Sequence, residues 1–562
     1  MPLLPYTSAT QQQLNRNTKA GNKIKIVATL SSGAWAFKLF IRYITETCIF
    51  PPQPTAMKKS LFFLFFAGAF FCAHAQDSLQ RFVRDSLDAY VTNALQDWQI
   101  PGAAVCVVKD GKVLVMKGYG VAEIGTGAKV DSATLFMIGS NTKAFTATAL
   151  AMLDAQKKLS LDDKVQTWLP DFKLYDPWVA KEATVRDLLC HRLGFETFQG
   201  DFMYFDSDLS LAEVREKFGK LKPVYSFRSK WGYTNAAFLT AGEIIPKATG
   251  KTWAQFLTDS LFTPLQMTRT LALSKDILTA TNKAAAHTVA HGVLKKIPYG
   301  RLENMAPAGA ISSSVNDLSH WVLMQLANGQ YGGKQVVPAA ALLATRTPAS
   351  ILGNGGALFN KGHFSLYGLG WFMQEYSGRK IVSHTGGVNG FVTAVTLVPE
   401  EKLGIIVLTN TDANSFYEAL NHELLDAGLN LPYRNYSKVY LGFAKQQQAQ
   451  ENAWLKQKQD SIALHLKPTL PLTAFAGNYT HPVYGSMTIR LKDSGLVATF
   501  EHHKGRFASL GALGGTRFLA QFNEALYGNK VWPFAIENNK VKSVTVTVAD
   551  FVEFTPYEFI KN

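Results

Sequence analysis

The hydrophobic pattern of the chain changes twice, and each change predicts a different kind of structure. Residues 103–121 hold an apolar run, the turn pair Asp110-Gly111 and a second apolar run, which predicts a β-hairpin. Helical spacing dominates the middle of the chain, as in 142–159 and 235–249. Strands on both sides of a helical insertion predict an α+β fold, with an antiparallel sheet covered by helices and a helical subdomain. The later strand-like runs are 380–383, 391–399 and 403–410.

The C-terminal part of the chain has a pattern of its own. A Gln- and Lys-rich segment predicts a helical connector over 436–467, which Pro468 closes. From 468 to 562, short alternating runs broken by Gly and Asn predict a small β-barrel-like domain. The main α+β domain is then expected over residues 80–432.

Near the start of the chain lies a segment with the three parts of a secretory signal. Met57-Lys58-Lys59 is a cationic start, 61–71 is an apolar run, and Ala73-His74-Ala75 is a small-x-small cleavage site. The apolar run is shorter than the roughly 20 residues that span a bilayer. We therefore expect a signal peptide over 57–75, export to the periplasm, cell envelope or medium, and no stable transmembrane anchor after cleavage.

Residues 1–56 precede this signal, although a signal peptide belongs at the N-terminus. We expect them to be a mis-called upstream extension, with Met57 as the real initiator. The alternative is a genuine extension anchored by its apolar segment 34–50, but charged residues interrupt that segment.

The formal charge of +15 first suggests an anionic partner such as nucleic acid. Residues 1–75 hold eight Lys or Arg and one acid, so they account for +7 of that charge. The aromatic residues, 12% of the chain, are scattered and not interleaved with basic clusters, which argues against nucleic-acid binding. Of four cysteines, Cys106 and Cys190 remain after cleavage, and both are expected to be buried thiols.

Three short segments carry candidate chemistry. Ser140 stands where an apolar run gives way to a helix, and Lys143 returns to the same face one turn later. A lysine that an apolar pocket keeps neutral can accept the serine proton. Tyr233-Thr234-Asn235 offers a phenol, whose pKa a neighbouring cation can lower, and an amide that can orient a substrate. His384-Thr385-Gly386-Gly387 offers a strand edge on which small residues let a substrate lie.

Each segment alone is weak evidence, but the three in this order resemble the penicillin-recognising serine hydrolases with a Ser-x-x-Lys motif. Within them the chain is similar to the class C beta-lactamase-like family, which includes D-alanyl-D-alanine carboxypeptidases, esterases and D-aminopeptidases. The resemblance runs from about Phe82 to Leu431. The C-terminal stretch resembles the lipocalin-like domain appended to many members. Flanking segments that match are 136–139, 159–163, 184–191, 307–313 and 367–371, and in the C-terminal stretch Tyr479, Tyr484-Gly485 and Phe551 to Phe554.

The resemblance implies a role for each of these residues. Ser140 would form an acyl-enzyme, and Lys143 and Tyr233 would share proton transfer, with the acylation base left open between them. The N–H groups of Ser140 and Gly387 would form the oxyanion hole. No metal and no cofactor are implied. The implied substrate-binding residues are Asn235, His384, Thr385 and Gly386.

One departure from the family pattern concerns specificity. Many penicillin-binding members have lysine where this chain has His384, and histidine is mostly neutral at pH 7. Recognition of a substrate carboxylate should therefore be weaker. We expect a peptidase or esterase for D-amino-acid, peptidoglycan-type or ester substrates, with weak beta-lactam hydrolysis.

Two pairs of histidines do not form a predicted site. His287 and His291 have i, i+4 spacing in a helix-like run, but no further ligand completes a metal site there. His502 and His503 are expected on opposite faces of a strand, at the surface. The alternative to an enzyme is a catalytically inactive penicillin-binding-like protein that binds cell-wall peptides or a partner. Whether the C-terminal module covers the active site, and whether the chain forms homo-oligomers, is left open.

Overall fold

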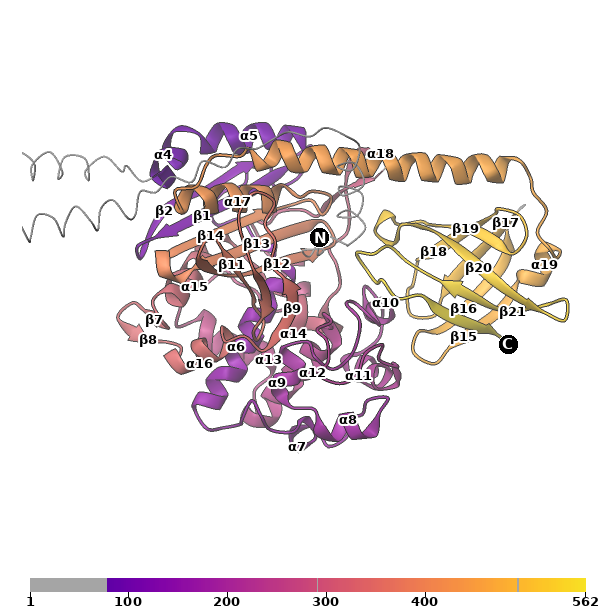
Figure 1. Cartoon of the computed structure of the whole chain (residues 1–562), viewed down its shortest axis with the longest axis horizontal. Helices are drawn as coiled ribbons and strands as arrows, with labels where there is room; N and C mark the ends of the chain where they lie inside the picture. The colour runs from indigo at the N-terminus through magenta and orange to yellow at the C-terminus, as the bar shows by residue number, and fades with distance from the viewer. Residues whose placement is uncertain (1–77, 291, 493–494) are drawn as a thin grey trace, which may run out of the picture. The chain divides into compact units, whose positions relative to one another are not determined.

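The computed structural model describes residues 78–290, 292–492 and 495–562. Its largest element is an eight-stranded antiparallel sheet in the order β2-β1-β14-β13-β12-β11-β10-β9 (Figure 1). β1 lies between β2 and β14, so distant parts of the chain build one sheet, as predicted. The predicted extension and signal peptide lie outside the described residues. The strands are β1 (Gly102–Lys109), β2 (Lys112–Gly120), β9 (Ser350–Asn354), β10 (Phe364–Tyr367), β11 (Phe372–Tyr376), β12 (Arg379–Val388), β13 (Phe391–Val398) and β14 (Leu403–Thr409).

The predicted hairpin at the start of the domain is confirmed. β1 pairs with β2 up to Lys109 opposite Lys112, which leaves two residues for the turn. Asp110 and Gly111 both have positive φ, 51° and 76°. A two-residue turn of this hand matches the twist of the flanking strands, and an Asp-Gly pair tolerates it well.

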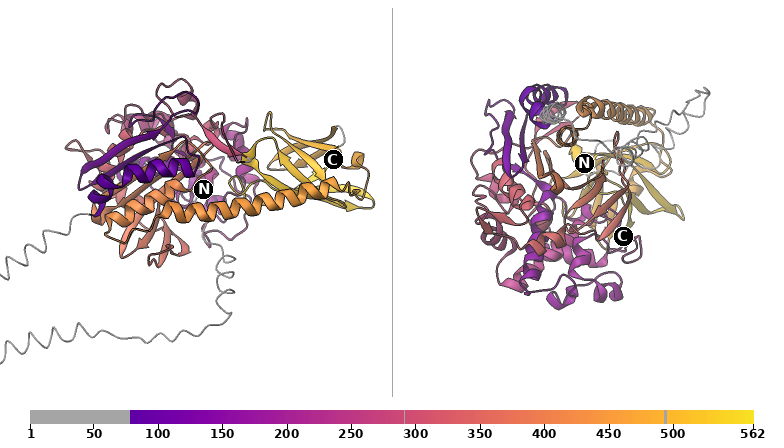
Figure 2. Two further views of the ribbon diagram at one scale, coloured as in Figure 1. Left: turned by 90° about the horizontal axis from the view of Figure 1, so that it is seen from above. Right: turned by 60° about the vertical axis from the view of Figure 1, so that its left-hand side comes forward.

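Alternate residues of β1 face two different hydrophobic cores, because successive side chains of a strand point to opposite faces. Val105 and Val107 pack with α5 (Leu87–Asp97) and α17 (Phe416–Gly428). Cys106 belongs to the core on the other face and is a buried free thiol, like Cys190, as predicted. Both faces of the sheet are thus covered by helices, with α5 and α17 on one side (Figures 1 and 2).

The helical insertion covers the second face of the sheet. Its central helices are α6 (Thr142–Ala155), α12 (Asn235–Thr249) and α15 (Val315–Leu326). α12 has the predicted bounds, and it ends at Gly250, whose φ of 73° suits a left-handed cap. The smaller helices are α7 (Val165–Trp168), α8 (Pro177–Glu182), α9 (Val185–Leu189), α10 (Asp201–Tyr204), α11 (Leu211–Lys220), α13 (Trp253–Leu257), α14 (Ala306–Gly309) and α16 (Ala339–Thr345).

The C-terminal part contains a long helix and a closed barrel. α18 (Tyr436–Ala463) is the predicted connector, and α19 (Leu472–Phe475) follows it. Eight antiparallel strands then pair in chain order, and β15 closes the barrel against β22. The barrel confirms the predicted small C-terminal β-barrel-like domain. Its strands are β15 (Gly477–His481), β16 (Gly485–Lys492), β17 (Gly495–Phe500), β18 (Phe507–Ala512), β19 (Arg517–Phe522), β20 (Asn529–Glu537), β21 (Lys540–Val546) and β22 (Tyr557–Lys561).

Among the described residues, no helix is both long and apolar enough to cross a membrane.

Candidate active site

Ser140 lies in a short helical turn, Gly139–Asn141, that leads directly into α6. Gly139 precedes it with a φ of 53°, a conformation that favours glycine. A Cβ at Gly139 would lie 2.8 Å from the backbone nitrogen of Gly387 in β12. This close approach holds the serine turn directly against the strand that carries His384.

Lys143, in the first turn of α6, is fully buried beneath Ser140. Its Nζ lies 3.1 Å from Ser140 Oγ, 2.6 Å from Asn235 Oδ1 and 2.8 Å from the carbonyl oxygen of Ala308. Burial lowers the pKa of Lys143 well below its ordinary value, against an opposing effect of the Asp201 charge. A neutral amine has two N–H bonds and one lone pair. Asn235 and Ala308 offer only acceptors, so in the neutral form of Lys143 they take both N–H bonds and leave the lone pair for the serine hydroxyl.

Tyr233 shares a hydrogen bond with Ser140 that pulls its pKa down, but burial is the larger effect and raises that pKa above its ordinary value. The prediction that Lys143 lowers the pKa of Tyr233 is therefore wrong. The physical reason is that burial removes the hydration a phenolate would need, and the charge of Asp201 disfavours the phenolate further. Tyr233 Oη is thus a protonated hydroxyl at neutral pH, able to donate and to accept at once.

Asn235 is the first residue of α12, and both the oxygen and the nitrogen of its side-chain amide form hydrogen bonds within the protein. Its Oδ1 accepts from Lys143, and its Nδ2 donates to Asp201 Oδ2 at 2.6 Å. Burial raises the pKa of Asp201 to about 7. The amide still lines the cavity at Ser140, but its hydrogen bonds make it first a positioner of Lys143.

β12 packs against the turn that carries Ser140. Thr385 and Gly387 line the same cavity as Ser140. A Cβ at Gly386 would lie 1.8 Å from the carbonyl oxygen of Ile138, so this glycine permits the strand to pack against the segment before the serine. Burial, followed by the proximity of Lys143, lowers the pKa of His384 to about 3, which leaves its imidazole neutral.

The cavity at Ser140 is small, about 50 Å³. Its lining is predominantly apolar, with the Asp201 carboxyl as its acidic group, and Lys143 lies below the floor with its pKa lowered by burial. The residues around it are Ser140, Phe198, Asp201, Phe205, Tyr233, Asn235, Leu302, Met305, Gly309, Phe372, His384, Thr385, Gly387, Val388 and Phe551.

The sequence model described as Beta-lactamase matches residues 87–429, well over half of the chain. The chain belongs to the beta-lactamase family. A second model, a domain of unknown function (DUF3471), matches residues 463–560.

Relatives of this beta-lactamase-family chain include the unguisins hydrolase of Aspergillus campestris, 29% identical over 71% of this chain and 76% of that protein. The protein flp of Staphylococcus aureus is 26% identical over 60% of this chain and 65% of its own length. A solved structure, the octameric penicillin-binding protein homologue from Pyrococcus abyssi, covers 84% of this chain and 99% of its own with a TM-score of 0.54. At 19% identity, that likeness shows the shared fold.

His191 and Tyr367, which were not among the predicted site residues, connect the Tyr233 segment to β12 in this beta-lactamase-family site. The backbone N–H of Thr234 donates to His191 Nδ1 at 3.0 Å, so the ring proton of His191 is on Nε2. That Nε2 lies 3.3 Å from the Tyr367 hydroxyl, which lies 3.2 Å from His384 Nε2. His384 Nδ1 lies 2.6 Å from the Thr385 carbonyl oxygen and must be the donor there. The four bonds therefore run in one direction through two neutral histidines.

The sequence contained partial signals for these groups. His191 and Tyr367 both lie in flanking segments that resemble the family, but no spacing rule connects residues 176 positions apart. Asp201 lies in the four-residue helix α10 with no motif around it. Its role follows only from the fold, which brings it to Asn235.

Two predictions about histidines are wrong. His287 lies in β4 (His287–Ala290), not in a helix; it sits 3.0 Å from the Asn410 carbonyl and accepts from the N–H of Ile124. His291 lies outside the described residues. His502 and His503 follow β17 in a turn, and His503 is buried, stacked on Phe202 with ring centroids 4.5 Å apart. Tertiary contact, not strand alternation, decides their positions.

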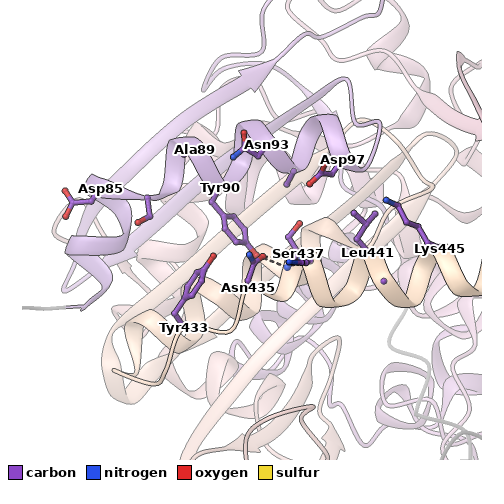
Figure 3. A pocket seen from close by; sticks show the side chains of 14 residues that line it. Asp85, Ala89, Tyr90, Asn93, Asp97, Tyr433, Asn435, Ser437, Leu441 and Lys445 are labelled. Atoms are coloured by element: carbon purple, nitrogen blue, oxygen red, sulfur yellow. Dashed lines mark hydrogen bonds between the residues drawn. The ribbon is translucent and has the colours of Figure 1, made fainter.

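A larger groove, of about 790 Å³, lies between α5 and the start of α18 (Figure 3). Tyr90 projects into it and accepts a hydrogen bond from the N–H of Ser437. None of the predicted catalytic residues is among those that line it. Within the described residues, moreover, no three His, Cys, Asp or Glu side chains are grouped to hold a metal.

Proposed function

We propose that the protein is an exported serine hydrolase that cleaves ester or amide bonds through an acyl-enzyme at Ser140. The observation that carries the proposal is the position of Lys143 Nζ, 3.1 Å from Ser140 Oγ and held by the Asn235 and Ala308 oxygens, where burial lowers its pKa. A general base within hydrogen-bond reach of a nucleophile is what acyl transfer needs.

In the acylation step, Ser140 Oγ attacks the substrate carbonyl carbon while its proton passes to Lys143 Nζ. The carbonyl oxygen becomes an oxyanion that the N–H groups of Ser140 and Gly387 face. When the tetrahedral intermediate collapses, the bond to the leaving group breaks. Tyr233 gives its proton to the leaving oxygen or nitrogen and regains one from Lys143. The acyl-enzyme and the neutral lysine remain.

Deacylation follows the same path with water as the nucleophile. Water attacks the ester carbon of the acyl-enzyme while its proton passes to Lys143 Nζ by way of the Tyr233 hydroxyl. The intermediate then collapses as Ser140 Oγ leaves and takes that proton back from Lys143. Acid–base work of this kind contributes roughly 10²–10⁴ in rate. The products are the free acid and the regenerated enzyme.

The proposed substrates are uncharged at the group that enters the cavity: an ester, or the amide of a D-amino-acid or peptidoglycan-type peptide. His384 is neutral and Lys143 is below the floor, so neither supplies the cation that would hold a β-lactam carboxylate. Weak beta-lactam hydrolysis is therefore part of the proposal, and dedicated beta-lactamase activity is not.

A fluorophosphonate probe tests the proposal directly. Wild-type protein should become labelled, and Ser140→Ala should not, with Ser461→Ala, at a partly exposed position of α18, as the matched control that labels normally. Equal labelling of wild type and Ser140→Ala would overturn the mechanism. No labelling of a folded wild type would favour the inactive, peptide-binding alternative.

A further inference from the structure

The loop between β21 and β22 of the C-terminal barrel reaches the active-site part of the chain. Glu553 in this loop is buried, and its carboxylate accepts the backbone N–H groups of Gly200 at 2.8 Å and Phe202 at 3.0 Å. The hydroxyl of Tyr484, from the barrel, donates to the same carboxylate at 2.5 Å. These bonds fasten the loop to both sides of Asp201, the residue that holds Asn235.

Aromatic and ionic contacts extend this attachment. Phe554 stacks on Phe198 with ring centroids 5.6 Å apart and an angle of 14° between the planes. Arg506 of the barrel donates to Asp206 at 2.8 Å, where both side chains are largely buried. The barrel is therefore held at several points along residues 198–206, by the β21–β22 loop and by Arg506 in the segment before β18.

Phe551 is the residue of this loop that enters the cavity. It lines the same space as Ser140 and Gly387. A Cβ built at Gly387 would lie 3.2 Å from Cε2 of Phe551, so the ring is in van der Waals reach of the predicted oxyanion donor. Phe205 meets the ring of Phe551 edge-on, with centroids 6.3 Å apart, and supports it from behind.

Because the cavity is small, the ring of Phe551 limits what can enter it. A cavity of about 50 Å³ is several times smaller than the pockets of about 300–1,000 Å³ that take drug-sized ligands. The space beside Ser140 therefore accepts a small group, and Phe551 is the part of its wall that the barrel supplies.

We propose that Phe551 is a specificity-determining residue: the barrel completes the substrate pocket, and the ring of Phe551 limits the acyl group to a short, uncharged, apolar one. This inference rests on the proposed function, because it concerns the acyl group transferred to Ser140. It answers what the sequence left open, namely whether the C-terminal module covers the active site.

The experiment compares p-nitrophenyl esters from acetate to octanoate by kcat/KM, in the full chain. Wild type should prefer the short esters. Phe551→Ala should raise the octanoate-to-acetate ratio of kcat/KM at least tenfold, and Phe551→Leu should raise it less. Phe364→Ala, which removes the same ring from an exposed position on β10, should leave the ratio unchanged.

The outcomes separate the two proposals. If the esters are hydrolysed in a Ser140-dependent way and both Phe551 variants keep the wild-type ratio, the role of Phe551 is wrong and the serine hydrolase stands. If Phe551→Ala fails to fold, the ratio measured for Phe551→Leu decides. If wild type and Ser140→Ala hydrolyse the esters equally, the proposed function fails, and the inference about Phe551 fails with it.

Discussion

Lys143 Nζ lies 3.1 Å from Ser140 Oγ at the point where β12 and α6 meet, and the lysine is completely buried. Burial makes an ammonium ion unfavourable there and so lowers the pKa of the amine well below its ordinary value. The fold thus supplies a base by burial, while the Asp201 carboxyl, on the far side of Asn235, opposes the lowering of the lysine pKa. Asn235 and Ala308 orient the amine so that its lone pair has one direction left.

We expect Lys143→Arg to reduce kcat/KM for a p-nitrophenyl ester by roughly 10²–10⁴, because arginine stays protonated and cannot accept the serine proton. In the wild type, kcat/KM should fall on the acid side, where Lys143 becomes protonated. It should level off well below pH 10.5, the ordinary lysine pKa, because burial lowers the pKa of Lys143.

Steady-state kinetics across pH 5–10 would check both expectations. Lys456→Arg, at an exposed position of α18, is the matched control and should behave as wild type. An acid limb centred near pH 10.5 would contradict a neutral lysine.

Tyr367→Phe should destabilise the protein, because it removes the hydroxyl between His191 and His384. The donor on His191 Nε2 and the acceptor on His384 Nε2 would both be buried without partners. A buried unsatisfied polar group costs about 1–3 kcal/mol. Urea unfolding would measure the loss, and Tyr433→Phe, at a mostly exposed tyrosine, should cost far less. The view of a directional chain of hydrogen bonds would be wrong if the two variants were equally stable.

The fold was largely predictable from the sequence because its signals are local. Asp110-Gly111 predicts its turn, and Ser140 and Lys143 meet because one helical turn separates them. The contacts of Asp201 and Glu553 have no local signal, because each depends on segments that lie far apart along the chain. His503 shows the same limit: alternation predicts a surface strand, while contact with Phe202 buries the ring.

His384 yields a prediction about pH. Its pKa is lowered to about 3, so the imidazole stays neutral from pH 5 to pH 8 and gains no charge near pH 6.5. His384 should therefore add no change over this range to the ratio of kcat/KM for an anionic cephalosporin to that for a neutral ester, while protonation of Asp201, whose pKa is about 7, can change that ratio. A ratio that rises as the pH falls through 6.5 in wild type and in Asp201→Asn alike would mean that His384 becomes a cation and attracts the carboxylate.

Gly386→Ala should remove both stability and activity. A methyl group at this position would lie 1.8 Å from the carbonyl oxygen of Ile138, which is backbone and already accepts from Thr393 Oγ1 at 3.0 Å. Neither group can move without displacing β12 or the turn that carries Ser140. Overpacking of this kind costs about 1–3 kcal/mol or more, and we expect kcat/KM to fall at least tenfold in the protein that still folds. Urea unfolding and ester hydrolysis would measure the two effects. Gly442→Ala in α18, where a Cβ meets open space, is the matched control and should lose neither; equal behaviour of the two variants would mean that β12 does not need a glycine to approach the serine.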